Sequence, residues 1–193
     1  MSVDDRLRLF VAVDLPENVR ESLRYLQAEL RGRNLGDLRW ARPEGIHLTL
    51  KFLGDTPAER VPSIREALRG PAAGAAPMHL ALGGLGTFGN RRPRVLWQEM
   101  TGDVGPLKEL REAVEGLLVG MGFPPEERDY SPHLTLARVP QPPPRGTAER
   151  IEAALAAVKP PEAEFEVTEF VLMRSILDRA GAVYQRLAAF PLG

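Results

Sequence analysis

The sequence predicts an α+β protein in which two similar lobes, related by a pseudo-two-fold axis, turn their sheets towards a central cleft. Segments with the two-residue period of a strand alternate with segments that carry the apolar stripe of a helix, and this order of elements occurs twice. The tetrapeptide His-Leu-Thr-Leu also occurs twice, at 47–50 and at 133–136. Such internal similarity indicates a duplication. We therefore expect residues 1–193 to form one two-lobed domain built from two sequence-similar βαβ-type halves.

The expected elements follow from the periodicity, with boundaries set by Gly, Pro and polar residues. In the first half we expect strands near 7–13, 46–53 and 78–82, and helices over 16–32 and 57–70. In the second half we expect strands near 95–97, 133–139, 165–172 and 183–187, and helices over 107–117 and 147–158. Asp14, Thr56 and Thr147 stand where side chains often cap the first turn of a helix.

The bulk composition is that of an ordinary folded protein. Of 193 residues, 44% are hydrophobic and 26% are charged, which argues against disorder. The formal net charge of −1 argues against a protein that coats long polyanions, but it leaves room for a local phosphate site. There are no cysteines, so disulfides and thiolate metal ligands are excluded.

No apolar run is long enough to span a bilayer, and the first residues lack the basic start and apolar stretch of a secretory signal. We therefore expect a cytoplasmic monomer with no membrane partner.

The repeated tetrapeptide can present two polar side chains from a strand. In a strand, His47 and Thr49 point to one face while the two leucines point to the other and can anchor the core. The second copy would offer His133 and Thr135 from the opposite wall of the cleft. Two facing imidazoles suit displacement at phosphorus, because one can remove a proton from the attacking oxygen while the other protonates the departing oxygen. The threonine hydroxyls can hold the non-bridging phosphate oxygens.

A structural role and a metal-binding role both fit the two motifs less well. A single His-Leu-Thr-Leu would most simply be a polar face of a half-exposed strand, but the duplication favours a shared function. A zinc site usually needs three or four protein ligands, and no His/Cys cluster or His-Glu-x-x-His motif supplies them. We therefore expect no metal and no cofactor.

Several cations could assist at a phosphate. Lys51 lies four residues after His47 and is expected on the same face, and Arg138 lies near the end of the second motif. We take both as candidate substrate-binding residues, although charged strand ends are the alternative. Arg91, Arg92 and Arg94 form the densest basic cluster, either a solvated loop or a guide for an RNA backbone.

Aromatic residues offer stacking surfaces or ordinary packing. The candidates for stacking on a base are Trp40, Phe88 and Tyr130. The third histidine, His79, has no threonine two residues on and is expected on a strand surface.

The chain resembles a known family over nearly its whole length. The residues that carry the resemblance are Arg8–Pro16, Arg39-Trp40, His47–Gly54, Pro93–Trp97 and Pro132–Val139. With two His-x-Thr-x motifs about half a chain apart, they look like the bacterial and archaeal LigT-like RNA 2′,3′-cyclic phosphodiesterases of the two-histidine phosphoesterase superfamily.

The resemblance implies a bilobal fold and metal-independent hydrolysis of RNA 2′,3′-cyclic phosphodiester ends to 2′-phosphomonoesters, with reversible 2′-5′ RNA ligation. It implies His47 as the proton donor and His133 as the proton acceptor, with Thr49 and Thr135 holding the phosphate. The expected partner is RNA with a 2′,3′-cyclic phosphate end, tRNA fragments included. Two alternatives stay open: the same site acting on small cyclic nucleotides or 2′-5′ oligonucleotides, and a non-catalytic module that binds RNA ends.

Overall fold

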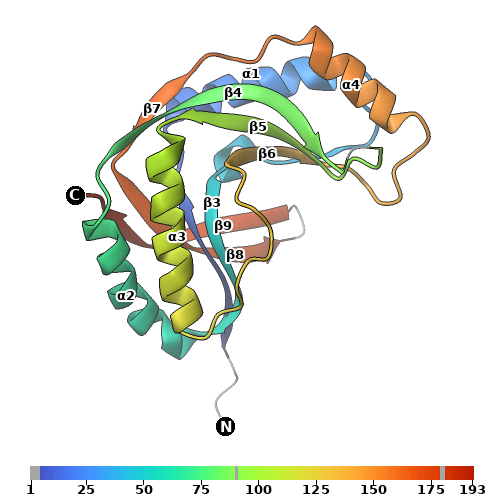
Figure 1. The fold of residues 1–193 in the computed structure, drawn as a ribbon. Helices are drawn as coiled ribbons and strands as arrows, with labels where there is room; N and C mark the ends of the chain where they lie inside the picture. The colour runs from blue at the N-terminus through green and yellow to red at the C-terminus, as the bar shows by residue number, and fades with distance from the viewer. Residues whose placement is uncertain (1–4, 90, 179–180) are drawn as a thin grey trace.

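The computed structural model describes residues 5–89, 91–178 and 181–193 and shows a curled sheet with helices on its outer face (Figure 1). The strands are β1 (Arg6–Val13), β2 (Arg39–Trp40), β3 (Leu48–Pro57), β4 (Met78–Phe88), β5 (Val95–Gly102), β6 (His133–Arg138), β7 (Glu164–Val167), β8 (Glu169–Asp178) and β9 (Gly181–Pro191). The helices are α1 (Glu17–Arg31), α2 (Val61–Ala73), α3 (Val104–Gly120) and α4 (Thr147–Ala157), with 3₁₀ turns at Pro43–Gly45 and Ala58–Arg60. The predicted α+β class is confirmed.

The described strands form one continuous antiparallel sheet in the order β7-β4-β5-β6-β3-β1-β8-β9, and β2 pairs with β6 outside this path. The order is symmetric about the junction of β6 and β3. A single pair, Leu48 with Leu134, joins the two strands there, and these two leucines hold the same place in the repeated tetrapeptide. The pseudo-two-fold relation therefore passes through the point where the two motifs meet.

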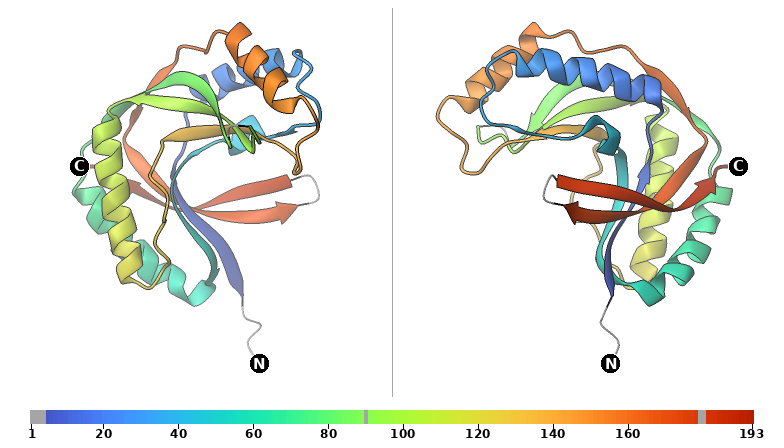
Figure 2. Two further views of the ribbon diagram at one scale, coloured as in Figure 1. Left: turned by 45° about the vertical axis from the view of Figure 1, so that its right-hand side comes forward. Right: turned by 180° about the vertical axis from the view of Figure 1, so that it is seen from behind.

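Two lobes flank this junction. Lobe A contains β1, β3, β8 and β9, and its outer face is covered by α2 and α3, which pack on each other and on β3, β8 and β9. Lobe B contains β2, β4, β5, β6 and β7. Its outer face is covered by α1 and α4, which lie together in both views of Figure 2.

The two lobes exchange helices. Helix α1 follows β1 of lobe A but lies on lobe B, where Gln27 Nε2 donates to the carbonyl of Leu136 in β6. Helix α3 follows β5 of lobe B but packs on β3 of lobe A. Each lobe thus draws its covering helices from both halves of the sequence.

The core consists of two apolar clusters on opposite faces of the sheet. The larger cluster fills the space between the sheet and the four helices, with Leu23, Leu68 and Leu107 fully buried. The smaller lies on the concave face of lobe A and consists of Phe10, Ala12, Val171 and Met173, with Tyr184 packed against it. Lobe A therefore has buried apolar residues on both faces, and the smaller cluster lies on the concave face near the junction.

Some local predictions are wrong. The helices α1, α2 and α4 have no side-chain caps. Asp14 instead binds Arg20, Thr56 lies within β3, and Thr147 donates to the carbonyl of Pro144.

The strand expected over 165–172 is two strands, because β7 pairs with β4 and β8 with β1, so the chain passes between lobes at Thr168. Within the described ranges no helix has the length and apolar character needed to cross a membrane. Residues 1–4, which bear on the expected absence of a secretory signal, lie outside those ranges.

Candidate active site

The four polar residues of the two motifs lie together on the concave face. Because Leu48 is directly opposite Leu134, the antiparallel register sets His47 across from Thr135 and Thr49 across from His133. All four side chains are half-buried, whereas the alternating leucines are buried in the main core. In an ideal antiparallel register, diagonal neighbours of this kind lie about 7–8 Å apart, with their Cβ atoms somewhat closer. The pairing of Leu48 with Leu134 therefore puts the two histidines on one face, at the junction of two neighbouring strands.

Both imidazoles are held by the same backbone contact. Nδ1 of His47 lies 2.8 Å from the carbonyl oxygen of Gly45, and Nδ1 of His133 lies 2.7 Å from that of Ser131. A carbonyl oxygen can only accept a hydrogen bond, so Nδ1 carries the hydrogen in each ring. The opposite nitrogen, Nε2, is left to exchange a proton with a ligand.

Aromatic side chains line both histidines. Phe10 stacks on His47 with ring centroids 4.6 Å apart, and Tyr184 meets the same imidazole edge-on at 5.0 Å. On the other side, Phe88 meets His133 edge-on at 4.8 Å. Trp97 packs against Phe88 and His133, with ring centroids 5.3 Å and 6.5 Å away, respectively. These rings restrict the imidazole orientation and reduce its contact with water.

The surroundings lower the pKa of both histidines below the ordinary value of 6.5, but the charges near them differ. Burial is the largest cause for each pKa, and the carbonyl bonded to Nδ1 opposes it. At His47, the carboxylate of Asp14 raises the pKa, and Arg20 opposes this more weakly. At His133, the guanidinium of Arg138 lowers the pKa further. Neighbouring charge thus favours the protonated form at His47 and the neutral form at His133.

A β-bulge places Arg138 on the concave face. Leu96 pairs with Ala137 and Trp97 with Thr135, so Leu136 is the extra residue of β6. Leu136 and Ala137 are both buried, and Arg138 returns to the face of Thr135 and is exposed. The structure therefore brings Arg138 to the site, beside His133.

The same bulge occurs at the equivalent position of β3 and removes Lys51 from the site. Val11 pairs with Lys51 and Ala12 with Thr49, so Leu50 is the extra residue. The prediction that Lys51 shares the face of His47 is wrong, because the bulge turns Lys51 into the interior. Only 5% of Lys51 is exposed, and its Nζ donates to Glu115 Oε1 at 2.8 Å and to the carbonyl of Pro124 at 2.6 Å.

A buried polar network behind β3 ties the two motif strands together. Glu115 on α3 accepts hydrogen bonds from Lys51 and from the backbone N–H of Glu126. Burial would raise the pKa of Glu115, but these bonds and the charges of Lys51 and Arg111 hold that pKa below its usual value. Tyr130 then donates its hydroxyl hydrogen to the carbonyl of Thr49. The loop that leads into His133 is therefore fastened to the strand that carries Thr49.

Of the three aromatic candidates, only Phe88 lies at the site. Trp40 packs against the main core beneath the guanidinium of Arg31, and Tyr130 is used by the network just described. His79 is exposed on β4, as predicted.

Phe10, Trp97 and Tyr184 contact the histidines from strands that are distant in the sequence, so no local pattern points to them. No group of three or more side chains able to hold a metal ion occurs among the residues that the structure describes.

A family model described as the 2′-5′ RNA ligase superfamily matches residues 12–179. The chain belongs to the 2′-5′ RNA ligase superfamily. It is 35% identical to an RNA 2′,3′-cyclic phosphodiesterase of Geobacillus stearothermophilus over 97% of its own length and 58% of that protein. It is 34% identical to an RNA 2′,3′-cyclic phosphodiesterase of Methanothermobacter thermautotrophicus over 97% of its own length and all of that protein.

Two solved structures share this fold. TT0787 of Thermus thermophilus superposes with a TM-score of 0.76 at 31% identity, covering 96% of this chain and 98% of that one. Escherichia coli LigT complexed with 3′-AMP gives a TM-score of 0.76 at 28% identity, covering 97% of this chain and 99% of that one. The resemblance to LigT-like proteins seen in the sequence is confirmed.

We predict that Lys51 stabilises this 2′-5′ RNA ligase superfamily protein and does not bind its ligand. Glu115→Gln should lower the free energy of unfolding by about 3 kcal/mol, because it leaves the Lys51 ammonium buried without its counter-charge. Since the pKa of Glu115 is lowered on folding, this loss should be complete above its ordinary value of 4.5 and shrink as the pH falls below it. Urea unfolding across pH measures the effect. A Lys51→Met, Glu115→Leu double variant should recover much of the stability, and a normal unfolding midpoint for Glu115→Gln would contradict the assignment.

The charge asymmetry predicts opposite pKa changes in two variants. Arg138→Gln should raise the pKa of His133 and leave that of His47 unchanged, because a nearby cation is removed. Asp14→Asn should lower the pKa of His47 and leave that of His133 unchanged. Titration of the imidazole resonances by NMR measures both values. A larger response at the histidine remote from the substitution would show that the charge assignments are wrong.

Proposed function

We propose that this protein hydrolyses the 2′,3′-cyclic phosphate at the end of an RNA chain and leaves a 2′-phosphomonoester, by general acid–base catalysis between His47 and His133. The observation that carries the proposal is the register of Leu48 with Leu134, which sets two identical His/Thr pairs on one concave face. The similarity to proteins named RNA 2′,3′-cyclic phosphodiesterase supports the reaction. The strained ring of the substrate supplies its own leaving group.

Each step uses one Nε2 atom. Neutral His133 accepts a proton at Nε2 from a water molecule, and the water oxygen forms a bond to phosphorus. The bond between phosphorus and the 3′-oxygen breaks, and protonated His47 donates its Nε2 proton to that oxygen. The phosphate remains on the 2′-oxygen. When the 5′-hydroxyl of a second RNA takes the place of water, the same two proton transfers give a 2′-5′ linkage.

The neighbouring charges support this direction of proton transfer. Asp14 stabilises an imidazolium at His47, and Arg138 disfavours one at His133. A bound phosphate anion raises the pKa of both rings, which offsets the effect of burial and allows His47 to be protonated near neutral pH. Thr49, Thr135 and Arg138 hold the non-bridging oxygens, where negative charge grows in the transition state. RNA with a cyclic phosphate end, tRNA fragments included, is the proposed partner.

Removal of either histidine should abolish most of the activity. We expect His47→Ala and His133→Ala each to lower kcat/KM on a cyclic-ended RNA by about 10² to 10⁴-fold, because each loses one proton transfer. Thr49→Val and Thr135→Val should lose less, since each removes one hydrogen bond. His79→Ala is the matched control and should keep full activity, because His79 is exposed outside the site. Full activity of His133→Ala would refute the mechanism.

The reaction should not need a metal ion. We expect the rate in EDTA to equal the rate without it, because both proton transfers and the phosphate contacts come from side chains. The product should carry its phosphate on the 2′-oxygen, which phosphorus NMR and the resistance of the product to a 3′-specific phosphatase both measure. Inhibition by EDTA that zinc reverses, or a 3′-phosphate product, would count against the proposal.

A further inference from the structure

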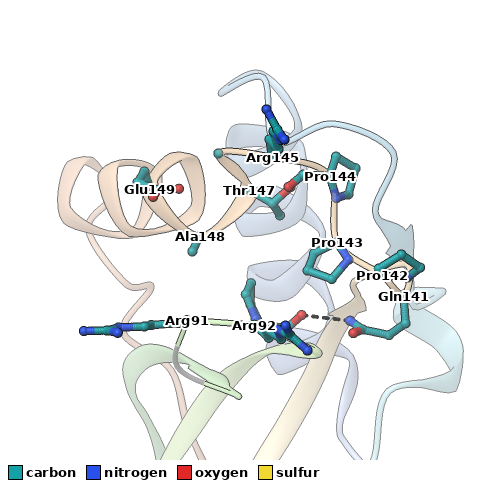
Figure 3. A pocket seen from close by; sticks show the side chains of 12 residues that line it. Arg91, Arg92, Gln141, Pro142, Pro143, Pro144, Arg145, Thr147, Ala148 and Glu149 are labelled. Carbon is teal, nitrogen blue, oxygen red and sulfur yellow. Dashed lines mark hydrogen bonds between the residues drawn. The ribbon is translucent and has the colours of Figure 1, made fainter.

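A pocket at the rim of lobe B, which we call the arginine pocket, lies outside the histidine site. It has a volume of about 390 Å³. Arg91, Arg92 and Pro93 of the β4–β5 turn form one side, and residues 141–145 with the first turn of α4 form the other (Figure 3). Three arginines and one carboxylate, that of Glu149, line it. This is a net charge of +2 on a chain whose total formal charge is −1.

The arginines of this pocket are available to a ligand. Arg91, Arg92 and Arg145 form no ion pair with any other residue in the described part of the chain, and all three are exposed. The first turn of α4 also faces the pocket, and the positive end of the helix dipole favours anions there, although the N–H of Thr147 already donates to the carbonyl of Pro144. Guanidinium groups match phosphate oxygens in shape and charge. The pocket is therefore suited to a phosphate group.

The walls of the pocket are held in place by hydrogen bonds. Gln141 Nε2 donates to the carbonyl of Pro93 at 3.0 Å, which joins the two sides. Thr147 Oγ1 donates to the carbonyl of Pro144 at 2.7 Å, and Arg150 donates to the carbonyl of Arg145 at 3.1 Å. A preorganised pocket binds without the entropic cost of ordering a loop.

The arginine pocket lies beyond the end of β6, the strand that begins with His133. Along β6 the concave face presents His133, then Thr135, then Arg138, and the chain reaches the pocket at Gln141. Arg39 on β2 pairs with Arg138 and is also exposed, so it adds a second cation to this line. From the other direction, Phe88 touches His133, and the β4–β5 turn that carries Arg91 begins just after it. The pocket lies within reach of a nucleic-acid chain whose end is at the histidines.

We propose that the arginine pocket is a second phosphate-binding subsite, which holds the RNA backbone upstream of the cyclic end while that end lies between His47 and His133. This proposal rests on the proposed function, because it assumes that the ligand at the histidines is the end of an RNA chain. The pocket gives longer RNA ends a lower KM than mononucleotides and leaves the chemical step unchanged. It binds the sugar–phosphate backbone and not a particular base.

The test compares substrates of different length in a pocket variant and a matched control. The pocket variant carries Arg91→Gln, Arg92→Gln and Arg145→Gln. The control carries Arg65→Gln, Arg69→Gln and Lys108→Gln, which remove the same charge from exposed positions on α2 and α3. The substrates are a 2′,3′-cyclic mononucleotide and a cyclic-ended RNA about ten nucleotides long.

We expect the pocket variant to raise KM on the long RNA about tenfold and to leave kcat, and all constants on the mononucleotide, unchanged. For the long RNA, the slope of log KM against the logarithm of the salt concentration should decrease by about 0.7 for each phosphate that the variant no longer binds. The control should behave as the wild type. Equal losses on both substrates, or no loss on either, would overturn the proposal.

A binding measurement separates this proposal from the proposed function. If the wild type turns over neither substrate, the proposed function fails, and fluorescence anisotropy with a labelled RNA ending in a 2′-phosphate then tests the pocket alone. Weaker binding of the pocket variant than of the control supports the subsite. Equal binding of the two variants overturns it.

Discussion

The pairing of Leu48 with Leu134 is the constraint on which the rest of this structure depends. It joins lobe A and lobe B into one sheet through a single residue pair. Because side chains alternate across a strand, the same pair that buries two leucines must bring the adjacent histidines and threonines to the concave face. A one-residue slip of either strand would turn its own histidine and threonine into the core and put its leucines in the cleft.

The surroundings of the two motifs are alike in their carbonyl and aromatic contacts and differ in their charges. Both rings bind a carbonyl through Nδ1, and both stand against aromatic side chains. The charges differ, with a carboxylate near His47 and a guanidinium near His133. Two equivalent imidazoles would have the same electrostatic environment, whereas here the neighbouring charges favour the protonated form of His47 and the neutral form of His133. The electrostatic difference between the two copies of the motif therefore comes from residues outside the repeated tetrapeptide.

The sequence was sufficient to predict the α+β class and the place of most strands and helices, because these depend on periodicity and on a repeated pattern. The prediction for Lys51 was wrong because a bulge at Leu50 breaks the alternation of side chains along β3. Leu50 and Lys51 are both buried, and nothing in the local sequence pattern signals the bulge. Tyr184 and Trp97 could not be assigned, because they reach the histidines through sheet pairings that span long stretches of chain. Short-range patterns contain no information on such pairings.

The exchange of helices has a consequence for how this protein could have arisen and for how it can be divided. If the ancestral half resembled one copy of the present repeat, its helix would have covered the sheet of a second molecule, as in a domain-swapped dimer. Fusion of two such chains would give one polypeptide with the same interlocked arrangement. A fragment cut near residue 90 would leave α1 without β5, β6 and β7 of lobe B, so complementary fragments should fold only when mixed.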